Sequence, residues 1–220
     1  MADPAALQKL LTWLSPAFPT GAFAWSGGLE FAISDGRASD SMALRHWLEA
    51  LLSHGGLRTD AILLSQAYRS HDDRAALQDL ADLALALAPA AERHEETLGI
   101  GEAFVAAARA WPSDVFAVLP RPCPYPIAVG AIAGAHDIPL ASVLVGFLTV
   151  SIQSQVSVAV RLLPLGQTAG LQVIAALEPI VARTAAAAET AALDDLGTIA
   201  YGADIAQMRH ETAEPRLFRS

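Results

Sequence analysis

A stretch without any charged side chain, residues 138–160, limits most strongly what this chain can fold into. A segment of that length could cross a lipid bilayer if it were apolar throughout. Its second half, however, carries serine or glutamine at positions 151, 153, 154, 155 and 157, and polar clusters of this kind disfavour membrane insertion. A largely apolar helix that does not span a membrane is a buried one. The stretch therefore predicts a helix inside a protein core or at an oligomer interface.

Helical periodicity extends over nearly the whole chain. Apolar residues recur at helical spacing, as in Leu7, Leu10, Leu11 and Leu14, whereas the alternation typical of strands is scarce. Alanine, the best helix former, is the most frequent residue. We predict an all-α fold, a single-domain bundle of about eight to ten helices covering residues 1–220. Beyond residue 56, helices are expected near residues 57–69, 73–88, 92–110, 127–136, 139–163, 167–189 and 193–212.

Capping residues and prolines predict where helices begin and end. Asp40 precedes a periodic stretch as an N-cap candidate, and Gly55-Gly56 follows that stretch as a stop signal. Four prolines between residues 120 and 126 divide the chain into halves, because proline removes an amide donor. Neither half is large enough to bury its apolar faces alone, so one domain is expected. Residues 209–220 are expected to form a partner-binding tail beyond the last helix.

Charge and composition exclude several functional classes. The net charge is −9 and the pI about 5.0, which argues against nucleic acid or an anionic membrane as a partner. Lys9 is the only lysine and lies outside any Gly-x-x-x-x-Gly-Lys loop, so a P-loop nucleotide hydrolase is excluded. The single cysteine, Cys123, fits a reducing compartment, and the N-terminus lacks the basic region of a signal peptide. A cytoplasmic location is therefore expected.

Catalytic and metal-binding patterns are not recognisable in the sequence. No two of the six histidines have the four-residue spacing that directs two imidazoles of a helix to one ion. Adjacent carboxylates such as Asp194-Asp195 are better explained by the favourable field at a helix N-terminus. We expect a protein without enzymatic activity that holds no cofactor stably.

Two segments are typical of protein-recognition surfaces. Residues 13–30 concentrate aromatic, proline and glycine residues, although such residues can equally close a helical core. The tail alternates arginine with apolar residues, so that it could order on a partner. The candidate partner-binding residues are Trp25, Ser26, Glu30, Arg209, Glu211, Arg216, Leu217, Phe218, Arg219 and Ser220. A further set, expected in dimer or core packing, comprises Tyr125, Pro126, Gly130 and Gly134.

Four landmarks occur in a characteristic order. They are Trp13-Leu-Ser-Pro-Ala-Phe-Pro-Thr-Gly-Ala-Phe with Gly28-Leu-Glu30, Tyr125-Pro-Ile-Ala-Val-Gly130, Val160-Arg-Leu-Leu-Pro-Leu-Gly-Gln167 and Arg216-Leu-Phe-Arg-Ser220. With these landmarks the chain resembles the UreF family of urease accessory proteins along essentially its whole length. The run Phe23-Ala-Trp-Ser-Gly-Gly28 differs from the family's usual Phe-Ser-Tyr-Ser-His-Gly, so no role of that family histidine carries over.

The resemblance implies a non-enzymatic, cytoplasmic homodimer that joins UreD (also called UreH) and the GTPase UreG on apo-urease. Nickel and GTP would be handled through UreG, and nickel would pass from there to the urease active site. The tail is expected to dock on UreD, and residues 127–163 to supply the core and part of a twofold interface. Two alternatives remain: a factor that activates or regulates the GTPase UreG through an arginine, and a small helical enzyme unrelated to urease.

Overall fold

Helices account for all the regular secondary structure in the computed structural model, which describes residues 3–220. This confirms the all-α prediction. The α-helices are α1 (Pro4–Trp13), α2 (Leu29–Ser34), α3 (Ser41–His54), α4 (Gly56–Arg69), α5 (Arg74–Ala86), α6 (Ala91–Ala108), α7 (Val115–Val118), α8 (Tyr125–Ala135), α9 (Leu140–Leu162), α10 (Gln167–Thr190) and α11 (Tyr201–His210). Two short 3-10 helices, η1 (Ala22–Ala24) and η2 (Leu193–Asp195), lie between them.

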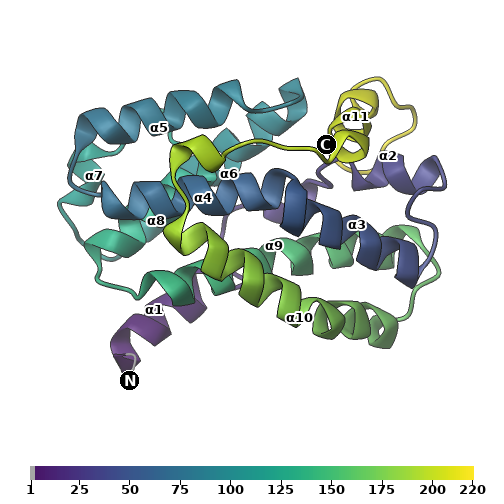
Figure 1. The fold of residues 1–220 in the computed structure, drawn as a ribbon, viewed down its shortest axis with the longest axis horizontal. Coiled ribbons are helices and arrows are strands. Elements are labelled where there is room, and N and C mark those ends of the chain that lie inside the picture. The colour runs from purple at the N-terminus through teal and green to yellow at the C-terminus, as the bar shows by residue number, and fades with distance from the viewer. Residues whose placement is uncertain (1–2) are drawn as a thin grey trace.

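The helix α8 forms the centre of the fold. Every residue from Pro126 to Gly134 is buried, and α4 and α6 pack closely against the helix (Figure 1). The contact with α4 depends on two glycines, because a Cβ atom on Gly130 or Gly134 would collide with the carbonyl oxygen of Leu64 or Tyr68. These two small residues therefore serve packing inside the monomer.

The charge-free stretch of the sequence forms most of α9. This helix packs beside α10 and also contacts α1, α2, α3, α4 and α8. By length and composition alone, α9 and α10 could each cross a membrane. In the fold, 44% of the residues in the most apolar 18-residue stretch of α9 are buried, and 39% of those in the corresponding stretch of α10. Both helices are thus partly buried, and their exposed large apolar residues are Val145 on α9 and Leu171 on α10.

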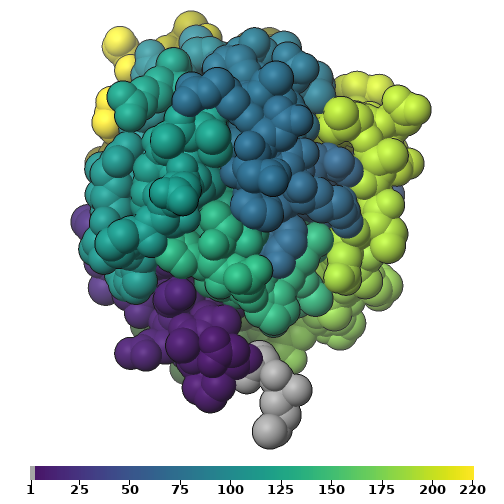
Figure 2. Space-filling model, turned by 90° about the vertical axis from the view of Figure 1, so that its left-hand side faces the viewer, coloured from purple at the N-terminus to yellow at the C-terminus, as the bar shows by residue number. Residues whose placement is uncertain are grey.

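The beginning of the aromatic segment, residues 13–30, packs into the helical core. Its first residue, Trp13, is buried and packs edge-on against Phe104 and Trp111, with ring centroids 6.3 and 5.6 Å apart. This end of the segment therefore closes the helical core. The preceding helix α1 projects from the lower edge of the molecule, as Figure 2 shows, and leaves Leu7 and Leu11 exposed.

The prediction of a continuous helix over residues 193–212 is wrong. Only η2 and α11 are helical there, and residues 196–200 between them have no regular secondary structure. Gly197 takes a positive φ of 143°, and the Ile199 amide donates to the carbonyl oxygen of His54, 3.0 Å away. A tertiary hydrogen bond and a flexible glycine thus replace the helical hydrogen bonds. The six-residue helix α2, which positions the site described next, was not among the expected helices.

Candidate partner-binding site at the C-terminus

The last residues of the chain run alongside the loop that precedes α2. The Arg219 amide donates to the carbonyl oxygen of Ala24 at 2.8 Å, and the Ser26 amide donates to the Ser220 carbonyl oxygen at 2.9 Å. The Gly27 amide donates to Ser220 Oγ at 3.0 Å, and Ser26 Oγ donates to the Ser220 carbonyl oxygen. Ser26 and Ser220 are fully buried. The C-terminal tail is therefore ordered on the protein's own body.

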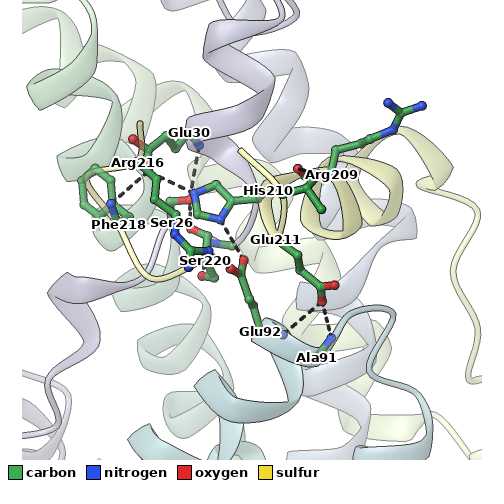
Figure 3. A network of polar contacts seen from close by, with 12 residues as sticks. Ser26, Glu30, Ala91, Glu92, Arg209, His210, Glu211, Arg216, Phe218 and Ser220 are labelled. Carbon is green, nitrogen blue, oxygen red and sulfur yellow. Dashed lines mark hydrogen bonds and ion pairs between the residues drawn. The ribbon is translucent and has the colours of Figure 1, made fainter. Parts of the chain in front are cut away.

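Glu30, in the first turn of α2, holds the segment just before that contact (Figure 3). Its carboxylate accepts hydrogen bonds from the amides of Leu217 and Phe218, at 2.7 and 2.9 Å, and lies 3.0 Å from His210 Nε2. Partial burial alone would raise the pKa of Glu30, but these hydrogen bonds outweigh it and lower the pKa below its ordinary value. The bound tail thus favours the ionised carboxylate.

His210 and Glu92 join the tail to two further helices. The buried ring of His210, at the end of α11, places Nδ1 2.7 Å from Glu92 Oε2 on α6. The other carboxylate oxygen of Glu92 pairs with the guanidinium of Arg216. One carboxylate therefore connects α6 to α11 and to the tail.

The next residue, Glu211, caps α6. Ala90 at the N-cap position has no side chain that could accept from the free amides. Glu211 Oε1 supplies the acceptor instead, 2.6 Å from the Ala91 amide and 3.4 Å from the Glu92 amide. A carboxylate is also favoured there by the helix dipole, so this contact stabilises the junction of α6 and α11.

Two arginines stack on the aromatic residues of the site. The guanidinium of Arg219 lies 4.6 Å from the ring centroid of Trp25, and that of Arg161 lies 4.7 Å from the ring of Phe218. Both aromatic rings are buried, which strengthens a cation–π contact relative to one in water. Phe218 is therefore an anchor of the tail.

The loop before α2 approaches α11 at Gly28. This residue has a φ of 79°, and a Cβ atom there would lie 2.7 Å from the backbone nitrogen of Gln207 and 2.8 Å from its Cγ. Only glycine fits both the backbone conformation and this contact. The loop, α11 and the tail consequently form one packed unit.

Comparison with known proteins assigns the family. The family model named UreF matches residues 38–178, more than half of the chain. A urease accessory protein UreF of Agrobacterium fabrum is 49% identical over 216 residues, covering 98% of this chain and 97% of the relative. The chain belongs to the UreF family. Urease accessory proteins UreF of Rhizobium etli and Rhodopseudomonas palustris are each 50% identical over 98% of the chain, covering 96% and 94% of the relatives.

Membership in the UreF family makes the chain a urease accessory protein, which implies a role in urease maturation. The resemblance drawn from the four sequence landmarks is thus confirmed. Sequence reasoning singled out the aromatic segment and the tail as two recognition segments and expected the loop either near the tail or on the side of UreG; in this UreF protein the loop and the tail lie against each other. The candidates that the structure brings together are Trp25, Ser26, Glu30, Glu211, Arg216, Phe218, Arg219 and Ser220.

Two of the candidate residues, Arg209 and Leu217, instead direct their side chains outwards. Arg209 points away from the network in Figure 3, and Leu217 is 80% exposed. Two network residues, His210 and Glu92, were not among the candidates. His210 adjoins two candidates in the sequence, but nothing there links it to Glu92, 118 residues away.

A second polar group of this UreF protein borders a cavity of about 360 Å³ between the aromatic loop, α6 and α9. Arg93 Nη2 lies 2.5 Å from Asp60 Oδ2 and Nη1 lies 3.2 Å from Glu96 Oε2. Burial raises the pKa of both carboxyls and outweighs the opposing effect of Arg93. Across residues 3–220, no three histidine, cysteine, aspartate or glutamate side chains are grouped so that they could hold a metal ion.

Proposed function

We propose that the chain is a non-enzymatic scaffold in urease maturation that bridges UreD (UreH) and the GTPase UreG on apo-urease. Its family and the ordered C-terminal site support this role. In this proposal nickel is cargo, delivered with GTP hydrolysis by UreG to the urease active site, and the chain itself holds no cofactor stably. The protein acts in the cytoplasm.

The exposure of Leu217 is the observation on which the proposal mainly rests. The residue is 80% exposed although its own amide is bound by Glu30 and the neighbouring residues Arg216 and Phe218 are anchored. An apolar side chain held rigidly in solvent has no role in the stability of the monomer. A partner that binds Leu217 does not have to order the tail, because the tail is already ordered in the monomer. The entropic cost of binding is therefore lower, which favours affinity.

A second set of exposed apolar residues lies on α11. Tyr201, Ile205 and Met208 follow one another at helical spacing, so they share one side of the helix, and all three are exposed. We call Leu217 and these three residues the C-terminal apolar face. The helix α11 lies at the end of the molecule where α2 and the C-terminus are also found (Figure 1). We assign this face to UreD.

Co-purification with UreD tests the assignment. The variant carrying Leu217→Ala and Ile205→Ala is expected to bind UreD at least about tenfold more weakly, since truncated interface anchors typically cost about 1–3 kcal/mol or more. Leu11→Ala, on α1, removes an exposed leucine outside the face and serves as the matched control. Equal UreD binding by the double variant and the control would contradict the proposal.

A homodimer is also part of the proposal. The support is that α9 and α10 are strongly apolar yet only partly buried in the monomer, with Val145 and Leu171 exposed, since exposed apolar residues on such helices can be covered by a second copy. Size-exclusion chromatography with mass detection on the isolated chain tests it. A dimer mass is expected, and a monomer mass over the micromolar range would contradict it.

Regulation of UreG through an arginine is the second candidate function. Arg45, Arg121, Arg183 and Arg209 are exposed and make no side-chain hydrogen bond or ion pair to the described residues 3–220. Arg209 is favoured among them because it lies on α11 with the C-terminal apolar face. Single-turnover GTP hydrolysis by UreG decides: a roughly thousandfold loss with Arg209→Ala indicates an arginine finger, and altered binding alone indicates the scaffold.

A further inference from the structure

Both ring nitrogens of His210 face carboxylate oxygens. Nε2 lies 3.0 Å from Glu30 Oε2 and Nδ1 lies 2.7 Å from Glu92 Oε2, while the ring itself is completely buried (Figure 3). A neutral imidazole carries one N–H group and can donate to only one of these acceptors. Its other nitrogen would then direct a lone pair at a carboxylate. The geometry therefore requires an imidazolium, or a proton on one of the two glutamates.

The surroundings favour the proton on the ring. Hydrogen bonds lower the pKa of Glu30, and the second oxygen of Glu92 pairs with the guanidinium of Arg216, so each carboxylate has a further partner that favours negative charge. With a charged His210 the cluster contains two cations and two anions. Without that proton it carries a buried net negative charge, which is costly.

The other charged groups near His210 are turned elsewhere. On α11, Arg209 points to solvent and Glu211 accepts from the first amides of α6. The helices packed against α11 are α2, which contributes Glu30, and α6, which contributes Glu92. From the tail, Arg219 stacks on Trp25. Among the described residues, Glu30 and Glu92 are thus the only carboxylates in contact with the His210 ring that can balance its charge.

We propose that His210 is a charged clamp that holds the C-terminal tail on the protein body and releases it when the ring loses its proton. As an imidazolium it fixes the carboxylate of Glu30, which in turn binds the amides of Leu217 and Phe218. Rising pH removes the clamp and frees the tail. Because Leu217 belongs to the C-terminal apolar face, the consequence for a partner rests on the proposed function: UreD binding weakens as the pH rises.

Nuclear magnetic resonance of the ring tests the charge state directly. In the isolated wild-type chain with its tail docked, His210 is expected to show two protonated ring nitrogens. A ring with a single N–H while the tail is docked would overturn the proposal.

Hydrogen exchange of the Leu217 and Phe218 amides tests the clamp. Their protection factors, corrected for intrinsic exchange at each pH, are expected to fall at least about tenfold as the ring proton is lost, the scale of one charge-assisted hydrogen bond. In His210→Gln the factors should be low and independent of pH over the same interval. His46→Gln, on the exposed side of α3, is the control and should keep the wild-type profile. Equal profiles for wild type and His210→Gln would overturn the proposal.

Binding of UreD at the same pH values separates the clamp from the proposed function. Weaker UreD binding over the pH interval in which the amides lose protection supports both. Loss of amide protection with unchanged UreD binding would leave the clamp intact and refute the role of the C-terminal apolar face. Constant protection would refute the clamp, whatever UreD does.

Discussion

Replacing Gly28 by alanine tests the packing of the aromatic loop against α11. Two costs are expected. The first comes from the φ of 79°, a left-handed conformation that costs a residue with a Cβ atom about 1 kcal/mol. The second comes from the new Cβ atom, which would lie 2.7 Å from the Gln207 nitrogen and 3.0 Å from its Cα. These are backbone atoms, so the strain cannot be relieved by rotating a side chain. Overpacking of this kind costs about 1–3 kcal/mol.

Gly36→Ala is the matched control, because Gly36 has nearly the same φ, 78°, and nothing lies within 4 Å of the place that its new Cβ atom would take. Urea denaturation should give a loss in the free energy of unfolding of about 1 kcal/mol for Gly36→Ala and about 2–4 kcal/mol for Gly28→Ala. The difference between the two variants measures the contact with Gln207. Equal losses would refute the packing of this loop against α11.

Three further predictions concern the core, the tail and acid. Gly130→Ala should lower the free energy of unfolding by roughly 2–4 kcal/mol, because the added methyl group meets the Leu64 carbonyl oxygen. The control Gly166→Ala has open space around its new methyl group and should change the free energy of unfolding by less than about 1 kcal/mol. Thermal and urea unfolding measure both values. Phe218→Ala should free the tail without unfolding the bundle, so limited proteolysis should remove the last residues of the variant and spare those of wild type. The pKa of Glu30 is lowered in the fold, so the contribution of its ionised carboxylate to the free energy of unfolding is complete above its ordinary value of 4.5 and is lost as the pH falls through the lower folded value. The stability advantage of wild type over Glu30→Gln should therefore shrink in acid. A constant difference would contradict the hydrogen bonding of Glu30.

The long helices could be predicted because their signals are local. The helix α3 begins where Asp40 accepts from the amides of Met42 and Ala43, and it ends at His54, before the glycine pair. Likewise α9 follows from one largely apolar stretch without charged residues, and its neighbour α8 from proline at its start. In each case the residues that decide the element lie within it or beside it.

The site could be predicted only in its parts. The aromatic segment and the tail stand out by composition, but their mutual contact depends on pairings between residues about 180 positions apart, such as Glu30 with His210. The same applies to the break before α11, where His54 binds the Ile199 amide. Interactions of this range leave no periodic signal in a single sequence. They explain why the tail was expected to order on a partner and is already ordered on the chain itself.

The hydrogen-exchange footprint of UreD on the intact chain tests the central claim most directly. We expect binding to slow exchange in α11 and at residues 216–218, while α5 and the start of α10 exchange as in the free protein. That pattern would place the partner on the C-terminal apolar face. Slowed exchange confined to α5 or α10, with α11 and the tail unchanged, would contradict the account.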